Sequence, residues 1–200
     1  MADHSTLIRT SQVLGITASG VMAGGILNFS MALVPTLILP ATTSKRTLDS
    51  SFLPGTPVSH ITTQWYYAYG IGKTVMPAIA LLTGSAYSYL SYHFRQGTLT
   101  QQGNVIAANY YLLAALFTFA PVPFTLLIMK PTNSRLIAKA ESAERDSLVG
   151  QKEKDVKSEL KASREEAEVQ SWLKTWASLN YARGLFPLVG TVCAVLATLS

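Results

Sequence analysis

The chain has 200 residues, of which 48% are hydrophobic and 14% charged, a composition that fits one mildly apolar domain. Its charge is unevenly distributed, because 19 of the 27 acidic and basic residues lie between Lys130 and Lys174, and residues 11–39, 96–129 and 184–200 contain none. A soluble domain carries charge over most of its surface, so this distribution predicts an integral membrane protein. The single cysteine, Cys193, lies in an apolar stretch, which excludes a disulfide scaffold and a cysteine-ligated zinc site.

Four apolar stretches approach the roughly 20 residues that a helix needs to cross a bilayer. They predict an all-α fold, a polytopic membrane protein whose single domain (residues 1–200) is a four-transmembrane-helix bundle. In the first stretch, Gly20 and Gly24 have the small-xxx-small spacing that lets another helix approach closely, and such faces are also compatible with a homo-oligomer. The expected spans lie near residues 12–39, 64–92, 105–129 and 177–199.

The connections between these spans differ in length and charge. Residues 40–63 predict a loop rich in Ser, Thr and Pro, and residues 93–104 predict a short polar link. Residues 130–175 carry ten basic and nine acidic side chains, which predict a charged, solvated helical excursion that packs weakly. This near balance of charge argues against a nucleic-acid partner. Basic residues gather beside the two long loops, which predicts that these loops face the cytosol.

Two ionisable side chains, Lys73 and Arg183, lie within expected spans, where insertion costs roughly 2.5–3.5 kcal/mol unless the group faces a cavity or a partner. Trp65, Tyr69 and Lys73 are spaced i, i+4, i+8, so they share one face of the second helix. A second polar and aromatic face on the fourth helix contains Trp176, Asn180, Arg183 and Pro187.

The expected topology brings both faces to the side of the long loops, where the first and third helices add Asn28 and Asn133. We therefore predict a pocket at the cytosolic end of the bundle, lined by aromatic rings and closed by the long loops. The opposite leaflet is expected to hold only scattered polar residues such as Ser85 and Asn109. Structural alternatives stay open for each candidate: interfacial anchoring for the tryptophans, snorkelling for the two cations, and a surface position for His60.

The sequence has no phosphate-binding glycine loop, nucleophile elbow, H-E-x-x-H or C-x-x-C motif. His4, His60 and His93 fall on separate segments, which argues against a histidine metal site or a haem held by two histidines. The groups that remain for catalysis are the side chains of Lys73, Arg183 and His60, the tyrosine hydroxyls and the side-chain amides. This set suits an apolar, polycyclic, acidic substrate, because rings stack on Trp and Tyr while cations stabilise a phenolate or enolate.

Motifs in all four expected helices resemble those of the fungal anthrone oxygenases, a family of small four-helix membrane proteins. They are residues 17–25 (TASGVMAGG), Trp65 with Tyr69-Gly70 and Pro77, residues 123–125 (PFT) and 129–136 (MKPTNSRL), and the W-x3-N-x2-R pattern of Trp176, Asn180 and Arg183. The resemblance implies an oxygenase of fungal polyketide biosynthesis that converts an anthrone to an anthraquinone with molecular oxygen, without a bound metal or flavin. It also implies residence in an endomembrane.

Combining the pocket with this resemblance gives a hypothesis for each residue. His60 or neutral Lys73 removes a proton from the methylene carbon, and Arg183 and Asn180 hold the resulting oxyanion. The expected substrate-binding residues are Trp65, Tyr69, Trp176, Asn133 and Asn28. A different class stays open: a non-catalytic membrane protein that binds a lipophilic ligand or scaffolds a biosynthetic complex. A small transporter is a third reading, which the absence of a visible internal repeat disfavours.

Overall fold

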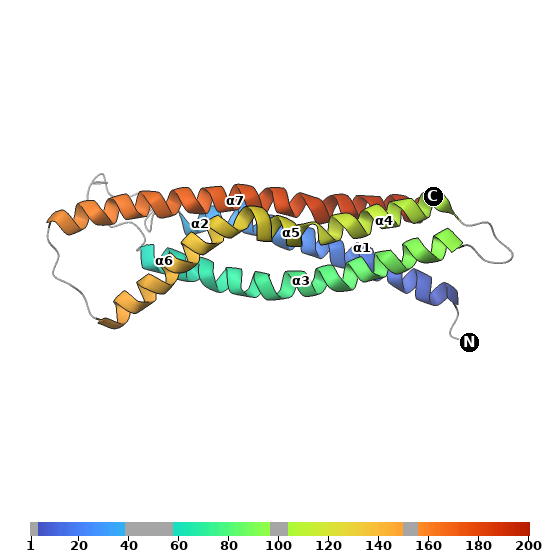
Figure 1. Cartoon of the computed structure of the whole chain (residues 1–200), viewed down its shortest axis with the longest axis horizontal. Helices are drawn as coiled ribbons and strands as arrows, with labels where there is room; N and C mark the ends of the chain where they lie inside the picture. The colour runs from blue at the N-terminus through green and yellow to red at the C-terminus, as the bar shows by residue number, and fades with distance from the viewer. Residues whose placement is uncertain (1–3, 39–57, 97–103, 150–155) are drawn as a thin grey trace, which may run out of the picture.

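The computed structural model describes residues 4–38, 58–96, 104–149 and 156–200, which form helices and contain no strand. These helices make four antiparallel rods, and both chain ends lie at one end of the elongated bundle (Figure 1). The predicted all-α bundle is confirmed. The rods are α1 (His4–Asn28) with η1 (Phe29–Leu33) and α2 (Val34–Leu37); α3 (Val58–Gln96); α4 (Val105–Phe119) with α5 (Pro121–Phe124), η2 (Thr125–Met129) and α6 (Lys130–Val149); and α7 (Val156–Leu199).

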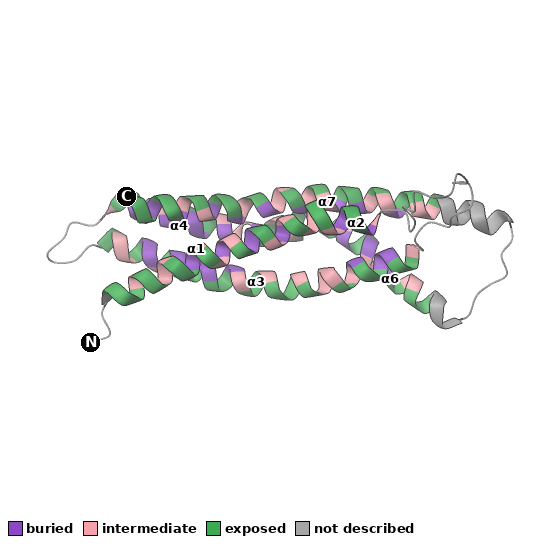
Figure 2. Cartoon of the chain, turned by 180° about the vertical axis from the view of Figure 1, so that it is seen from behind, coloured by how far each residue is buried: buried purple, intermediate pink, exposed green. Residues whose placement is uncertain are grey.

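The outward faces of the rods are largely apolar, and the buried residues face neighbouring rods (Figure 2). Three helical stretches are long and apolar enough to cross a membrane: Ser5–Leu37, Val105–Arg145 and Arg164–Leu199. The expected span at residues 64–92 is helical but is not among them. Its tyrosines, serines and Lys73 lower the mean hydropathy, although its outward face carries exposed Ile71, Val75, Leu81 and Leu82.

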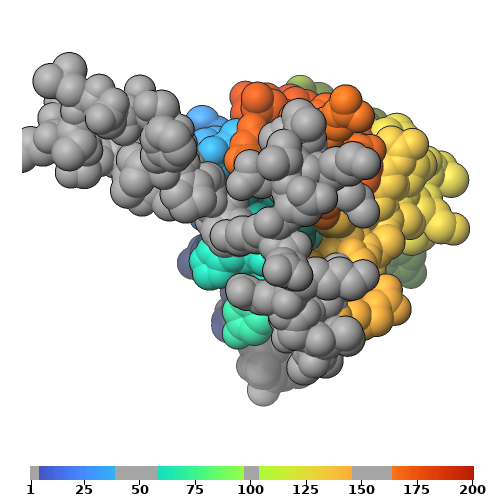
Figure 3. Space-filling view, turned by 90° about the vertical axis from the view of Figure 1, so that its left-hand side faces the viewer, coloured from blue at the N-terminus to red at the C-terminus, as the bar shows by residue number. Residues whose placement is uncertain are grey.

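Segment boundaries differ from expectation at the end with the long loops, called the loop end from here on. Helix α3 begins at Val58, so His60 lies in its first turn and the prediction of a loop there is wrong. Seen from this end, the start of α3 lies beside α2, and α6 lies on the opposite side (Figure 3). Residues 39–57, which include Lys45 and Arg46 of the expected loop, lie outside the described residues, as does most of the expected link at 93–104.

The charged excursion is not a separate, weakly packed helix. Its described parts extend two rods, as α6 and the first half of α7. Leu136 and Leu173 are fully buried between these helices, and an ion pair joins Lys139 of α6 to Glu165 of α7. Apolar residues at helical spacing therefore anchor the excursion to the bundle despite its high charge.

The core has three parts along the bundle. The loop-end core contains Trp65, Trp176, Met129 and the apolar residues of the excursion. A small middle cluster consists of Met22, Ile26 and Ala80. The far-end core, nearer the chain termini, is built from tyrosines and alanines. Packing is therefore thinnest in the middle, where the cavity described below lies.

The far-end core also contains a network of hydroxyl hydrogen bonds that joins three rods. Ser19 of α1 pairs with the Tyr87 hydroxyl at 2.8 Å, and Thr191 of α7 donates to Ser19 at 2.8 Å. Further along, the Tyr111 hydroxyl accepts from Gln12 at 2.9 Å and pairs with Thr198 at 2.8 Å. The expectation of only scattered polar residues in this half is wrong, because these uncharged groups satisfy one another inside the bundle.

Close helix approach occurs at glycines other than the expected pair. A Cβ built on Gly20 or Gly24 meets nothing within 4 Å, so these positions pack against no helix of the described chain. A Cβ on Gly84 would lie 2.3 Å from the Phe119 ring, and one on Gly15 would lie 2.6 Å from Tyr87. The small-xxx-small interpretation is therefore wrong within the described chain. The rotation of α1 turns Gly20 and Gly24 away from its neighbours.

Two rods contain π-helical segments, η1 and η2. The change to π-helical hydrogen bonding at η2 follows Pro121 and Pro123, which have no backbone N–H to donate. Segment η1 precedes Pro35, which stands in the first turn of α2. Such widened turns recur at functional sites because they redirect side chains. Both segments contribute residues to the central cavity.

Candidate functional site

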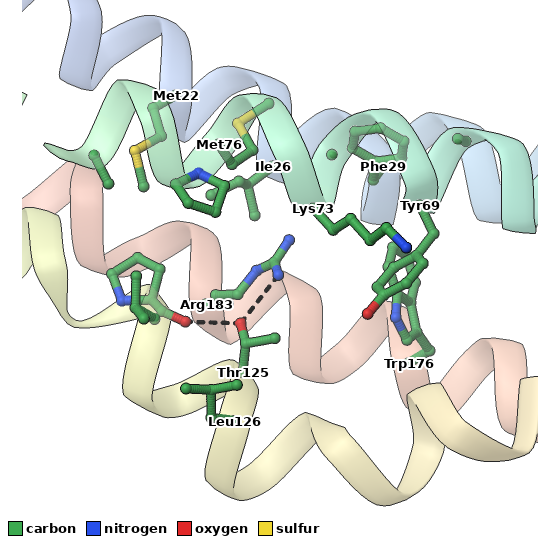
Figure 4. A pocket seen from close by; sticks show the side chains of 16 residues that line it. Met22, Ile26, Phe29, Tyr69, Lys73, Met76, Thr125, Leu126, Trp176 and Arg183 are labelled. Atoms are coloured by element: carbon green, nitrogen blue, oxygen red, sulfur yellow. Dashed lines mark hydrogen bonds between the residues drawn. The ribbon is translucent and has the colours of Figure 1, made fainter. Parts of the chain in front are cut away.

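A cavity of about 210 Å³ lies between the loop-end core and the middle cluster. All four rods contribute to its wall, and most of the wall is apolar or aromatic (Figure 4). Pro77, Val122 and Leu126 line the cavity and are also exposed, so it opens on the side of the bundle between α3 and η2. The lining residues are Met22, Ile26, Phe29, Ala68, Tyr69, Gly72, Lys73, Met76, Pro77, Ala80, Pro121, Val122, Thr125, Leu126, Trp176 and Arg183.

Arg183 is held at the cavity by a two-step hydrogen-bond chain. Its Nη1 donates to Thr125 Oγ1 at 3.1 Å, and Thr125 Oγ1 donates to the Pro121 carbonyl at 2.7 Å (Figure 4). The Thr125 proton is thereby directed to Pro121, which leaves an oxygen lone pair facing the guanidinium. Arg183 Nε is buried and has no hydrogen-bond partner among the described residues. The guanidinium is thus held by Thr125 through Nη1 at the wall of the cavity.

Lys73 and Tyr69 form the opposite wall, on consecutive turns of α3. The Lys73 ammonium lies 5.9 Å from the centre of the Tyr69 ring, and its side chain is exposed. The Tyr69 ring stacks on Trp65, with centroids 5.0 Å apart and planes 12° apart. The Tyr69 hydroxyl points into the cavity on the side of Arg183 (Figure 4). The predicted common face of Trp65, Tyr69 and Lys73 is confirmed.

The charge of the cavity is one-sided. Among the described residues, its lining includes the cations Lys73 and Arg183 and no carboxylate. A cation in low-dielectric surroundings is costly unless an opposite charge or polar partners compensate it. This lining therefore favours a ligand that carries, or develops, negative charge.

Trp176 forms the wall of the cavity at the loop end, and Trp65 and Asn133 lie behind it. Trp176 lines the cavity, donates from Nε1 to Asn133 Oδ1 at 2.9 Å, and meets Trp65 edge-on at 5.7 Å. Trp65 and Asn133 are buried behind it and do not line the cavity. The expected convergence of these residues is thus observed, but Asn133 orients Trp176 instead of reaching the cavity.

Asn180 is fully buried one turn from Arg183. Its Nδ2 donates to the Ile26 carbonyl at 2.8 Å and to Ser30 Oγ at 3.0 Å, which ties α7 to the turn before and within η1. Its Oδ1 has no hydrogen-bond partner. Because both amide hydrogens are engaged and the residue does not line the cavity, the structure does not bring Asn180 to the position expected of an oxyanion donor.

His60 and Asn28 lie outside the cavity. His60 is exposed, makes a 2.8 Å contact with Gln64 Nε2, and lines two open grooves beside α3, one of which is also lined by Lys73 and by Glu144 of α6. It precedes Lys73 by 13 residues, a rise of about 20 Å along the helix. Asn28, the last residue of α1, is exposed as well. The structure therefore brings together Lys73, Arg183, Tyr69 and Trp176, but not these two residues.

Thr125 lies in one of the sequence motifs, but the sequence pattern gave it no role in the site. It follows Pro121 by four residues, the spacing at which a threonine hydroxyl reaches the carbonyl of the preceding turn. Met22, Ile26, Phe29 and Met76 were also missed, because apolar residues in a span give no signal that separates a cavity wall from core or lipid contact. Among the described residues, no group of three His, Cys, Asp or Glu side chains lies close enough to hold a metal.

Fold and cavity together define a helical bundle of membrane type whose interior suits an apolar ligand with an anionic group. The chain belongs to the anthrone oxygenase family, whose sequence profile matches residues 65–193. It is 29% identical to the anthrone oxygenase nsrD of Aspergillus novofumigatus over 176 residues, covering 88% of each chain. It is 29% identical to the anthrone oxygenase encC of Aspergillus fumigatus over 199 residues, covering all of this chain and 96% of the relative.

A third relative, the anthrone oxygenase ptaC of Pestalotiopsis fici, is 31% identical over 139 residues, or 68% of this chain and 83% of its own. The resemblance identified from the sequence motifs is confirmed. The matched residues include Tyr69, Lys73, Thr125 and Arg183, whereas α1 and His60 lie before them. No solved structure matches the fold.

Proposed function

We propose that this chain is a membrane-embedded oxygenase that converts an anthrone-type aromatic polyketide to an anthraquinone with molecular oxygen, without a bound metal or organic cofactor. One observation carries the proposal: an apolar, aromatic cavity holds two cations and no carboxylate. The relatives nsrD, encC and ptaC, each named an anthrone oxygenase, support the choice of substrate class.

The cavity suits a flat, tricyclic molecule in its surface chemistry. Methionine and aliphatic side chains from α1 and α3 cover the ring faces, and Arg183 meets a phenolic or enolic oxygen. The volume of about 210 Å³ lies below the roughly 300–1,000 Å³ of typical ligand sites, so part of the substrate extends into the side opening. That opening is rimmed by apolar side chains, as expected if the substrate arrives from the lipid phase.

The reaction we propose needs no external reductant. A neutral Lys73 removes one proton from the methylene carbon, and the charge spreads to the ring oxygen beside Arg183. The resulting carbanion transfers electrons to O₂, and the carbon gains a C–O bond. Loss of its second hydrogen with cleavage of the O–O bond leaves a carbonyl, and the other oxygen departs as water. The substrate supplies all four electrons that reduce O₂, so atoms and charge balance.

Lys73 replaces His60 as the proposed base because of position. Lys73 lines both the cavity and the groove beside α3, whereas His60, near the start of α3, lines only grooves outside the cavity. An amine accepts a proton only in its neutral form, so the proposed step requires a deprotonated Lys73.

The direct test is an oxygen-consumption and quinone-formation assay on the purified protein with an anthrone. Arg183→Ala and Lys73→Ala are expected to lose most activity, whereas the controls Arg95→Ala and Lys174→Ala retain it. Arg95 contacts Asn109 at the far end, and Lys174 is exposed outside the cavity. Full activity in both cavity variants would overturn the proposal, and binding of the anthrone without turnover would favour a carrier. A stoichiometric metal or a haem band would overturn the cofactor-free mechanism.

We also propose that the protein resides in an endomembrane with its loop end in the cytosol. The basic residues Lys130, Arg135, Lys139 and Lys174 lie at the loop end, against Arg9 and Arg95 at the other. Protease treatment of sealed microsomes is expected to cleave near residues 146–156 from outside. Cleavage there only after the membrane is permeabilised would reverse the orientation.

A further inference from the structure

We infer that the hydroxyl group of Tyr69 is a second hydrogen-bond donor to the substrate oxygen beside Arg183, and that the Tyr69 ring is not a stacking surface for the substrate. This inference rests on the proposed oxygenase function. It changes the role expected for Tyr69 from its sequence position, and it fills the donor position that Asn180 was expected to occupy.

Both faces of the Tyr69 ring are already covered by its own helix. Trp65, four residues earlier, stacks on it with centroids 5.0 Å apart. Lys73, four residues later, places its ammonium 5.9 Å from the ring centre. Residues at i−4 and i+4 flank a helical side chain from opposite directions along the axis. A substrate ring would therefore have to displace one of these partners before it could stack on Tyr69.

The hydroxyl group is the part of Tyr69 that remains available. Within the described residues it makes no hydrogen bond, and it projects into the cavity toward Arg183 (Figure 4). Arg183 lines the same cavity, and Thr125 holds its guanidinium there through Nη1. A neutral donor from α3 and a cationic donor from α7 thus converge on one region of the cavity.

This pair fits the charge that develops in the proposed reaction. When a base removes the methylene proton, the electron pair delocalises to the carbonyl oxygen of the ring system. An oxygen that gains negative charge becomes a better acceptor, so donors aimed at it stabilise the transition state more than the bound substrate. Arg183 supplies charge and Tyr69 supplies a directed O–H. No proton leaves Tyr69 in this step, because the hydroxyl only donates a hydrogen bond.

Asn180 is unsuited to this position because its amide hydrogens bind Ile26 and Ser30. If Asn180 donated to the substrate instead, α7 would lose its hydrogen bonds to α1 and to the π-helical segment η1. Tyr69 needs no such rearrangement, since its hydroxyl group has no bond to lose within the described residues.

The test compares Tyr69→Phe with Tyr69→Leu and with the control Tyr66→Phe. Tyr69→Phe keeps a ring that stacks on Trp65 and removes only the hydroxyl; we expect kcat to fall about 10²-fold or more, the usual effect of removing one oxyanion donor, with KM little changed. Tyr66 lines the outer groove and not the cavity, so Tyr66→Phe should keep wild-type kcat. Full activity of Tyr69→Phe together with loss in Tyr69→Leu would show that the ring matters instead, and would overturn the inference.

Two further measurements separate this inference from the proposed function. Anaerobic exchange of the methylene hydrogens in D₂O reports proton removal without oxygen, and Tyr69→Phe should slow it by the same factor as kcat. Binding of a hydroxylated anthraquinone anion to folded Tyr69→Phe, read by fluorescence, should weaken; unchanged affinity and exchange would overturn the inference. If the wild-type protein forms no quinone and exchanges no hydrogen, the proposed function itself fails.

Discussion

The two halves of the bundle use polar side chains in opposite ways. In the far half, Ser19, Tyr87 and Thr191 satisfy one another across three rods. In the cavity half, Arg183 Nε, Asn180 Oδ1 and Trp65 Nε1 are buried without partners. Each unsatisfied group costs about 1–3 kcal/mol. The difference indicates that the polar groups of the far half pair with one another, whereas the cavity half keeps unpaired polar groups in and behind the cavity wall.

The contrast has exceptions on α3. The hydroxyls of Thr83 and Tyr89 are also buried without partners, and neither residue lines the cavity. What distinguishes the cavity half is therefore the kind of group left unpaired, because a cation that lacks a counter-charge is found there. Helix spacing differs as well. In the far half, Gly15 and Gly84 pack closely against the rings of Tyr87 and Phe119, and two π-helical segments lie beside the cavity.

The largest effect is expected for Arg183→Met, which replaces the cation with an apolar chain of similar length. Quinone formation should fall about 10²–10³-fold or more, since a charged oxyanion donor is lost. The free energy of unfolding should not fall, because an uncompensated charge leaves the interior. Thermal unfolding in lipid nanodiscs and the oxygenase assay measure the two quantities. If Arg183→Met lowers the free energy of unfolding as well as the rate of quinone formation, Arg183 stabilises the fold and its loss of activity is indirect.

Gly84→Ala tests the close packing of the far half. The new Cβ would lie 2.3 Å from the Phe119 ring, and such overpacking costs typically about 1–3 kcal/mol. Gly70→Ala, on the same helix, meets nothing within 4 Å and should stabilise by up to about 1 kcal/mol through helix propensity. Chemical unfolding curves for the two variants compare them directly. Equal stability would mean that α3 and α4 are not in close contact at Gly84.

Tyr87→Phe is the far-half counterpart of Tyr69→Phe, because both remove one hydroxyl from α3. Tyr87 pairs with Ser19 at 2.8 Å, so we expect a loss of about 0.5–1.5 kcal/mol in stability with kcat unchanged. Tyr69→Phe should show the reverse: reduced kcat with unchanged stability. If both variants lost stability and neither lost activity, the hydroxyl groups of Tyr69 and Tyr87 would both serve only the stability of the fold, and the contrast between the two halves would be wrong.

The sequence predicted the fold and part of the site for a simple physical reason. Charge inside an apolar span is rare, so Lys73 and Arg183 were conspicuous, and their helical spacing to Tyr69 and Trp176 identified the faces that meet. The periodicity of a single helix does not specify how that helix is rotated against partners distant in sequence. The Ser19–Tyr87 pair, 68 residues apart, depends on that rotation, as does the choice of Gly84 over Gly20 for close packing.

The site residues that sequence patterns misplaced follow the same rule. Asn180 shares a helical face with Arg183, but its contact is decided by the π-helical segment of α1, which no pattern located. His60 was assigned to a loop because Ser, Thr and Pro precede it, although α3 already begins at Val58. Thr125 was inconspicuous because a threonine in a span usually bonds its own backbone. It does so here, and it also accepts from Arg183.

This double use of Thr125 leads to the smallest loss of activity that we expect from a change in the cavity wall. Thr125→Val keeps the shape of the side chain and removes the oxygen that accepts from Arg183 Nη1 at 3.1 Å. A hydrogen bond to a charged group contributes about 1.5–3 kcal/mol, but the freed guanidinium can bind the substrate oxygen in other orientations. We therefore expect kcat to fall only about tenfold, corresponding to about 1.4 kcal/mol in the barrier.

Thr125→Ser retains the hydroxyl and should restore most of the rate, which a purely steric role would not predict. Steady-state kinetics of both variants, with the far-half control Thr198→Val, measure the effect. Thr198 pairs with Tyr111 at 2.8 Å, so its loss should lower stability and leave kcat intact. If Thr125→Val keeps the wild-type rate, Arg183 is positioned by the substrate alone, and the cavity half is less preorganised than its hydrogen bonds indicate.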